Sequence, residues 1–179
     1  MTTQLALLRA VNVGGHGKMP MARLCEVFLN LGFGGARTLL QSGNVVFEAS
    51  GPRALLENKI ESALADQLGL QTEVMVRSAA GWAAIVAGNP FPDEAKRDPA
   101  HLVLAVLKGT PRARAVEDLR AAIRGPELFH VERDHAYIVY PNGIGRSKLT
   151  SQVIESRIGT RATARNWSTV LKLAALAGV

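Results

Sequence analysis

The chain has 179 residues, of which 47% are hydrophobic, so it is long and apolar enough for one large domain or two small ones. Its first residues, Met1–Gln4, lack the basic and apolar segments of a signal peptide, and no apolar run approaches the roughly 20 residues of a membrane helix. The single cysteine, Cys25, cannot form an internal disulfide. We therefore expect a cytoplasmic protein without a membrane segment.

Basic side chains are concentrated towards both ends of the chain. The net charge is +6 at pH 7. Residues 1–40 carry four basic side chains against one acidic, residues 140–179 carry six against one, and residues 41–139 carry eleven against thirteen. This asymmetry favours an anionic partner. A soluble protein from an arginine-rich proteome would show the same surplus, so both interpretations stay open.

The first half of the chain follows a β-α-β-β-α-β order. Hydrophobic periodicity, helix-opening prolines and helix-ending glycines indicate its boundaries. They predict a strand over 5–11, a helix from Pro20 to Gly32, a strand over 37–41, a tight turn at Ser42-Gly43-Asn44, a strand over 45–47, a helix from Pro52 to Gly69 and a strand over 72–76. This order is the split βαβ pattern of ferredoxin-like domains.

The same pattern restarts after a short helix near 82–87 and a proline-containing, charged linker. The sequence predicts strands over 102–107, 128–132, 137–140 and 160–163, a helix from Pro111, a helix capped by Ser147 and running to Ile158, and a final helix over 166–177. The predicted fold class is α+β, with two ferredoxin-like, split β-α-β subdomains built on antiparallel sheets, plus a C-terminal helix. We place the first half at 1–79, the short helix and linker at 80–100, and the second half with its added helix at 101–179.

This topology brings polar loops together at the ends of the sheets. In the first half, the loop Asn12–Lys18 and the hairpin Gln41–Asn44 should share one end. In the second half, the loop Asn142–Lys148 should lie near the strand exit at Arg165–Trp167. Two basic, amide-rich clusters are therefore expected.

The two glycine-rich loops resemble anion-binding loops in their chemistry. Asn12–Lys18 and Gly143–Lys148 combine free backbone N–H groups with cations near a helix start. Neither has the spacing of a phosphate-binding P-loop. A flexible connection and a serine-capped turn are the respective alternatives.

The segment Arg165–Thr169 joins a strand to the final helix. Asn166 is a plausible N-cap. The helix is expected to bury the stripe of Trp167, Val170, Leu171 and Ala174. A polar stripe then remains, made of Arg165, Ser168 and Lys172. It would face solvent, a ligand or the other half of the protein.

Arg9 interrupts an apolar strand on the face shared with Leu5, Leu7 and Val11. Because burial of an unpaired charge is costly, Arg9 needs water, a carboxylate or a ligand. An internal ion pair is the alternative to ligand binding.

The signals for enzymatic or metal chemistry are thin. Cys25 lies on the expected buried face of a helix and is interpreted as a core residue. Carboxylates fall in the linker and on helix faces, away from both polar clusters, and no spacing of Cys or His favours a metal.

Base stacking of the RNA-recognition type needs exposed aromatic residues on central strands. Phe47 is the only candidate in the first half, while Tyr137 and Tyr140 fall on opposite faces in the second. We therefore predict no cofactor, no metal and no recognition of nucleic acid by base stacking.

Five stretches of the chain resemble one family. They are A-L-L-R-A-V-N-V-G-G (6–15), Q-S-G-N-V-V-F (41–47), N-P-F (89–91), S-K-L (147–149) and T-A-R-N-W-S-T-V-L-K-L (163–173). Together they resemble the bacterial family called domain of unknown function 1697. That resemblance implies a small cytosolic α/β protein with ferredoxin-like subdomains and no agreed activity. The family pattern would have Gly at position 10 and Asn or Arg at 168, where this chain has Ala and Ser.

The leading hypothesis is a non-catalytic binding module for an anionic ligand, either a nucleic acid or a phosphorylated small molecule. Its candidate ligand-binding residues are Arg9, Asn12, Lys18, Gln41, Ser42, Asn44, Arg146, Lys148, Arg165, Asn166 and Lys172. The alternatives are an enzyme acting on a small polar substrate in an interdomain cleft, and motifs with a purely structural role. The sequence leaves the oligomeric state open.

Overall fold

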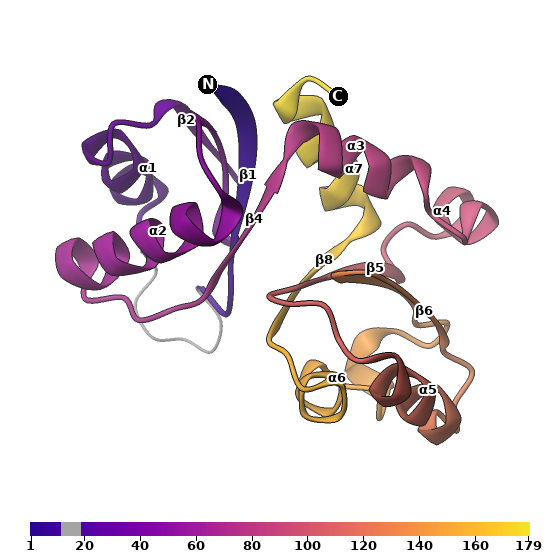
Figure 1. The fold of residues 1–179 in the computed structure, drawn as a ribbon. Helices are drawn as coiled ribbons and strands as arrows, with labels where there is room; N and C mark the ends of the chain where they lie inside the picture. The colour runs from indigo at the N-terminus through magenta and orange to yellow at the C-terminus, as the bar shows by residue number, and fades with distance from the viewer. Residues whose placement is uncertain (12–18) are drawn as a thin grey trace. The chain divides into compact units, whose positions relative to one another are not determined.

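A computed structural model describes residues 1–11 and 19–179 (Figure 1). The predicted glycine-rich loop and its two candidate ligand-binding residues, Asn12 and Lys18, lie outside the described residues. Contacts divide the chain into one unit made of Met1–Ala87 and Lys172–Val179, and a second unit made of Gly88–Leu171. In the part of the chain that the structure describes, no helix combines the length and the apolar character needed to cross a membrane.

The first unit contains an antiparallel sheet of four strands. Its elements are β1 (Thr2–Leu8), α1 (Met21–Asn30), β2 (Gly34–Leu39), β3 (Asn44–Ala49), α2 (Arg53–Leu68), β4 (Val74–Ser78) and α3 (Ala79–Ala87). The strand order is β2-β3-β1-β4, with every neighbouring pair antiparallel. This element order and sheet confirm the predicted ferredoxin-like arrangement.

The core of the first unit lies between one face of the sheet and the helices α1 and α2 (Figure 1). The rings of Phe28, Phe33 and Phe47 form a cluster in this core, with centroids 5.0 to 6.2 Å apart. Around it pack fully buried aliphatic residues of every layer, among them Leu8, Leu24, Ile60, Leu64, Val74 and Val76. The helical periodicity of α1 and α2 therefore has a direct packing explanation.

The end of β1 lies against the hairpin between β2 and β3, whereas the loop 12–18 that was predicted to lie near this hairpin falls outside the described residues. The backbone N–H of Leu8 donates to the carbonyl of Gly43 at 2.9 Å. A Cβ at Gly43, whose φ is +70°, would stand 2.9 Å from the Cβ of Leu8 and 3.2 Å from that of Val11. The strand ends earlier than the predicted 5–11 range, and Ala10 takes a left-handed φ of 55°. That conformation favours glycine, which is the residue that the family pattern would place there.

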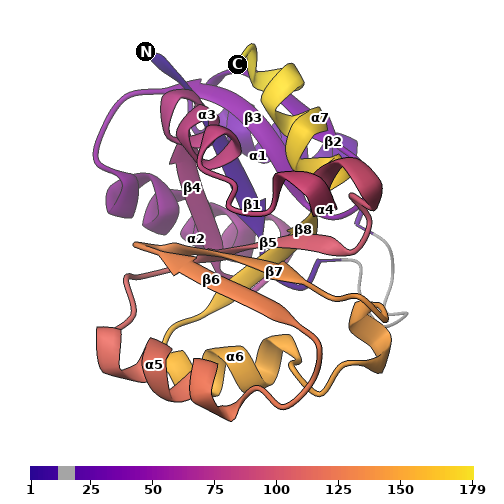
Figure 2. The same ribbon diagram turned by 90° about the vertical axis from the view of Figure 1, so that its right-hand side faces the viewer.

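The second unit repeats the sheet. Its elements are α4 (Pro92–Arg97), β5 (Leu102–Leu107), α5 (Ala113–Ala122), β6 (Leu128–Glu132), β7 (His135–Val139), the 3-10 turn η1 (Ile144–Arg146), α6 (Ser151–Ile158), β8 (Ala162–Asn166) and the start of α7 (Trp167–Ala177). The strand order is β6-β7-β5-β8, again antiparallel throughout. Figure 2 shows α5 and α6 on one face of this sheet.

Both faces of the second sheet are buried. The face towards α5 and α6 carries a core that includes Leu119, Ile138, Leu149, Ile154 and Ile158. The opposite face is also closed to solvent, and its side chains include Leu102, Leu104, Val106 and Tyr137. Strands that are buried on both faces appear in a sequence as continuous apolar runs, as β5 does.

The predicted linker contains the helix α4, which the sequence pattern did not indicate. Pro92 occupies the first helical turn, where its missing N–H leaves no hydrogen bond unmade. Acidic Asp93 and Glu94 follow in the first turn, and basic Lys96 and Arg97 lie in the last turn. This order of charges complements the helix macrodipole. The helix α4 has only six residues, too few to show a hydrophobic period in the sequence.

Two details of the predicted helices also change. Thr150, rather than Ser147, caps α6, and its side chain accepts from the N–H of Val153 at 3.3 Å. Leu171 is exposed on α7, where Leu173 takes the predicted buried position beside Val170 and Ala174. The predicted cap of α7 is confirmed, because the Oδ1 atom of Asn166 accepts from the N–H of Thr169 at 3.0 Å.

Candidate functional site

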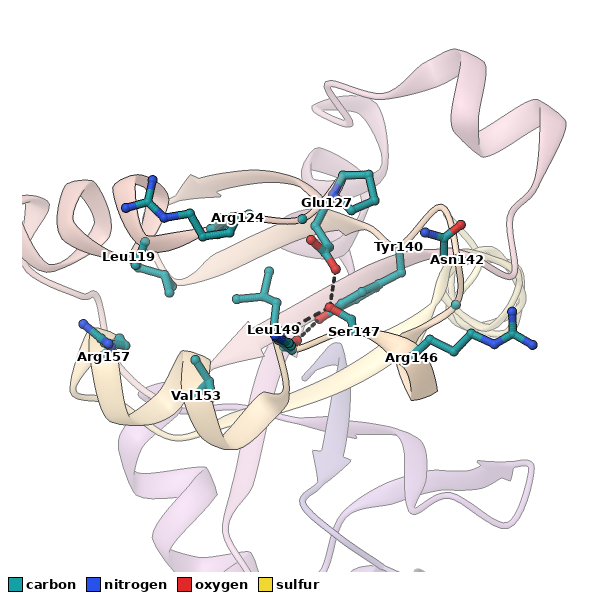
Figure 3. A pocket seen from close by; sticks show the side chains of 16 residues that line it. Leu119, Arg124, Glu127, Tyr140, Asn142, Arg146, Ser147, Leu149, Val153 and Arg157 are labelled. Carbon is teal, nitrogen blue, oxygen red and sulfur yellow. Dashed lines mark hydrogen bonds between the residues drawn. The ribbon is translucent and has the colours of Figure 1, made fainter.

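A cavity of about 390 Å³ lies in the second unit (Figure 3). Three segments enclose it: the end of α5 with the turn that follows, the loop after β7, and α6. The lining residues from α5 and its turn are Leu119, Ala122, Ile123, Arg124, Gly125, Pro126 and Glu127. Those from the other two segments are Tyr140, Asn142, Gly143, Arg146, Ser147, Lys148, Leu149, Val153 and Arg157. A cavity of this size falls in the ordinary range of small-molecule sites.

The ferredoxin-like topology explains why these segments meet. The α5–β6 connection and the β7–α6 connection both leave the same end of the sheet, where β5 begins. Hydrogen bonds fix the second connection there, because the N–H of Tyr140 donates to the carbonyl of His101 and the N–H of Gly143 donates to that of Tyr140, both at 2.9 Å. The site is thus built on strand ends, which hold a loop in a defined position.

A chain of hydrogen bonds fixes the inner wall of the cavity (Figure 3). The buried hydroxyl of Tyr140 donates to the carbonyl of Leu149 at 2.9 Å, and the N–H of Leu149 donates to the Oγ atom of Ser147 at 2.9 Å. The Ser147 hydroxyl in turn donates to a carboxylate oxygen of Glu127. Gly125 leaves room for this carboxylate, since an added Cβ would overlap its oxygen. The wall is therefore organised before any ligand arrives.

The electrostatics of this wall keep Tyr140 protonated. Burial raises the pKa of its phenol well above the usual value near 10, and the negative charge of Glu127 raises it further. The phenol therefore stays protonated, and remains a hydrogen-bond donor, to a higher pH than an ordinary tyrosine. It acts on the backbone of Leu149 and so holds the loop that carries Ser147 and Lys148.

Four cations surround the cavity: Arg124, Arg146, Lys148 and Arg157. All four are exposed, and within the described residues 1–11 and 19–179 none of them forms an ion pair with a carboxylate. Glu127, the one acidic residue in the lining, already accepts from Ser147. The cavity therefore has a surplus of positive charge that a bound anion would balance.

Two of the predicted site residues, Arg146 and Lys148, meet at this cavity. Glu127 was missed, and the expectation that carboxylates lie away from the polar clusters is wrong for it. The same topological argument that placed Asn142–Lys148 at this end of the sheet also places the α5–β6 connection there. That argument is the signal from which Glu127 could have been found.

Arg165 lies at the predicted end of the sheet but does not line the cavity. Both β7 and β8 flank the start of β5 there, since Val139 pairs with Leu102 and Asn166 with Val103. Ala162 and Ala164 of β8 face the helices, so Arg165 points to the opposite face.

The Arg165 side chain is buried in that second face. Its Nη1 atom donates to the Oγ1 atom of Thr163 and to the carbonyl of Ala164, both at 2.8 Å. Burial lowers its pKa to about 10. A ligand-binding role for Arg165 and for Asn166 stays a prediction.

The remaining predicted residues lie in the first unit. Arg9 forms an ion pair with Glu73, with 3.9 Å between Nε and Oε2, so the alternative of an internal ion pair is confirmed. The buried amide of Asn44 donates to the carbonyl of Leu39 at 3.0 Å and to the hydroxyl of Ser42 at 2.8 Å. Gln41 and Lys172 are exposed. Ligand binding by any of these residues stays a prediction.

Comparisons with known proteins agree with this fold. The conserved bacterial protein SP0830 from Streptococcus pneumoniae has a solved structure that is 21% identical in sequence to this chain. The alignment covers 98% of each chain, with a TM-score of 0.78. At this identity the likeness establishes the fold alone. A search of curated proteins finds no match.

A family model described as "Protein of unknown function (DUF1697)" matches residues 1–137. The match includes the α5 side of the cavity and ends before the loop after β7. It covers well over half of the 179 residues. The chain therefore belongs to the DUF1697 family of proteins of unknown function.

Proposed function

We propose that this protein is a binding module for a small anionic ligand, such as a phosphorylated small molecule, and that the cavity of the second unit is its binding site. The observation that carries the proposal is the set of four exposed cations, Arg124, Arg146, Lys148 and Arg157, around one partly open cavity. Each cation lacks a carboxylate partner among the described residues. An anion that enters the cavity gains attraction to several cations and separates no existing ion pair.

The hydrogen-bonded wall supports the binding proposal. Ser147 is the obvious nucleophile in the lining, yet its hydroxyl accepts from Leu149 and donates to Glu127. Both bonds hold the loop in shape. A wall that these bonds hold rigid lowers the entropic cost of binding.

The burial of the aromatic residues favours a small molecule over a nucleic acid. Proteins that bind single strands without sequence preference stack bases on exposed rings. Phe47, Tyr137 and Tyr140 lie on or next to central strands, and each is at most 2% exposed. These rings offer little surface for base stacking, which favours a small ligand.

Inorganic phosphate is a suitable probe for this proposal. We expect it to shift the backbone amide resonances of Gly143 to Lys148 in a nuclear magnetic resonance titration. The double variant Arg146→Gln/Lys148→Gln should bind phosphate at least about tenfold more weakly, since each lost cation removes about 1 kcal/mol of attraction at 4 Å even in bulk water. Added salt should weaken binding to the unaltered protein.

The matched control removes two cations elsewhere in the same unit. Arg112 and Arg120 are exposed on or next to α5 and lie outside the cavity lining. Arg112→Gln/Arg120→Gln should leave phosphate binding within about twofold of the original value. An equal loss in both double variants would show that net charge, rather than this cavity, attracts phosphate. Unshifted resonances around the cavity would remove the proposed site altogether.

A further inference from the structure

The cavity has a polar end and an end whose inner lining is mainly aliphatic, which we call the apolar end. Figure 3 shows Asn142 and Arg146 at one end, with Leu119 and Val153 towards the other, where the exposed Arg124 and Arg157 also lie. The polar end also carries the backbone of Gly143 and the hydroxyl of Ser147. The two ends therefore offer different chemistry to one ligand.

Aliphatic side chains form the apolar end. Leu119 lies in α5, Ile123 is the C-cap residue that follows α5, and Val153 lies in α6. Leu119 and Leu149 are 1% and 5% exposed and form the inner wall, whereas the partly exposed Ile123 and Val153, which is 37% exposed, offer accessible aliphatic surface. An isolated anion such as phosphate would leave this apolar surface uncovered.

We infer that the ligand is a free amphipathic anion, in which a phosphate or carboxylate head is attached to an apolar body. The inference rests on the proposed function and adds the chemical class of the ligand. The head would lie at the polar end near Arg146 and Lys148. The body would lie between α5 and α6, against Leu119, Ile123 and Val153. Such a ligand matches charge and apolar surface at the same time, as small-molecule sites generally do.

A series of alkyl phosphates tests this inference on the full chain by isothermal titration calorimetry. Methyl, butyl and hexyl phosphate carry the same head on apolar bodies of increasing length. We expect each added CH₂ to tighten binding about fourfold until the apolar end is filled, because burial of a CH₂ is worth that factor. Val153→Ser should weaken hexyl phosphate binding and leave methyl phosphate binding unchanged.

Two further variants keep this test sharp. Ala122 is exposed and lines the cavity, so Ala122→Leu should fill part of the apolar end and stop the gain at a shorter chain. Leu55→Ser removes an exposed aliphatic side chain from α2, outside the cavity, and should leave the whole series unchanged. Circular dichroism spectra would verify that each variant is folded.

The outcomes separate the ligand class from the proposed function. Equal affinity for methyl and hexyl phosphate would overturn the amphipathic ligand and leave anion binding intact. If no alkyl phosphate of the series binds, both the amphipathic ligand and the proposed anion-binding function are overturned. A further contrary result is that the protein sediments with phosphatidylglycerol vesicles and that hexyl phosphate fails to release it. That result would also overturn the inference, because the protein would then bind the phosphate groups of a membrane surface and not a free molecule.

Discussion

At the scale of single residues, Ala10 departs from ordinary backbone geometry, as do Leu40 and Arg133. Its φ of 55° places it in the left-handed region, where a Cβ approaches the following carbonyl oxygen. The residue is exposed, so no packing of its methyl group offsets this cost. The conformation at the end of β1 is therefore maintained by its surroundings.

Ala10→Gly should raise the free energy of unfolding by about 0.5–1 kcal/mol. Removal of the Cβ relieves roughly 1–2 kcal/mol of left-handed strain, and the greater freedom of glycine in the unfolded chain cancels part of that gain. Urea unfolding would measure the change. The same substitution at the exposed helical residue Ala54 should instead lower stability by about 0.5–1 kcal/mol. A loss at both positions would contradict the explanation from strain.

Residue roles were the hardest feature to derive from the sequence. Arg165 and Arg146 are equally cationic in the sequence, yet one is buried in a strand and the other lies at a cavity opening. Alternation along β8 decides this difference, and the predicted strand 160–163 ended before Arg165. Glu127 was missed for another reason. Its partner Ser147 is 20 residues away, and only the shared end of the sheet brings them together.

At the scale of secondary structure elements, the hairpin between β2 and β3 depends on Gly43. Its φ is +70°, and an added Cβ would stand 2.9 Å from that of Leu8. Gly32, after α1, has a similar φ of +77° but no atom within 4 Å of an added Cβ. The two glycines therefore share a backbone requirement and differ in crowding.

Gly43→Ala should lower the free energy of unfolding by about 2–4 kcal/mol, the sum of left-handed strain and overpacking against Leu8 and Val11. Gly32→Ala should cost about 1–2 kcal/mol, from strain alone. Urea unfolding of the two variants under one set of conditions gives the difference directly. Equal losses would mean that the hairpin yields to the extra methyl group and that contact with β1 does not constrain it.

Elements were predicted well wherever local signals and packing agree. Pro52, Gly69 and the apolar period of α2 all indicate the same helix, which the structure has over Arg53–Leu68. The strand β5 was found over its full length from its apolar run. The helix α4 was missed because its six residues include a proline and several charges but are too few to show a hydrophobic periodicity. The cap of α6 was misassigned because Ser147 and Thr150 carry the same kind of side chain.

At the scale of the whole molecule, two ferredoxin-like sheets follow from one repeated pattern, but charge and burial differ between the units. The candidate site falls in the second unit, where burial raises the pKa of Tyr137 to about 12 and that of Tyr140 well above its usual value. Arg165 in the same unit has its pKa lowered to about 10. These shifts connect the site to the stability of the unit at alkaline pH.

The signs of these shifts differ. A tyrosine whose folded pKa is raised contributes stability below its unfolded pKa, near 10, and that stability is lost as the pH rises through the folded pKa. A lowered pKa at Arg165 has the opposite effect, since the unfolded chain holds the proton more tightly between pH 10 and 12.5. A single stability curve would mix both effects. Comparison with a variant isolates one tyrosine.

Tyr140→Phe provides that comparison. At pH 8 the variant should unfold about 1 kcal/mol more easily, because the carbonyl of Leu149 loses its hydrogen bond. Between pH 10 and 12 this deficit should shrink and then reverse, because only the original protein must keep a buried phenol protonated.

Urea unfolding followed by far-ultraviolet circular dichroism at pH 8, 10, 11 and 12 would measure the stability of both proteins. Arg165 affects the two proteins equally and cancels in their difference. A deficit that stays constant across this range would mean that the Tyr140 phenol ionises as readily in the fold as in the unfolded chain, which would contradict a pKa raised by burial.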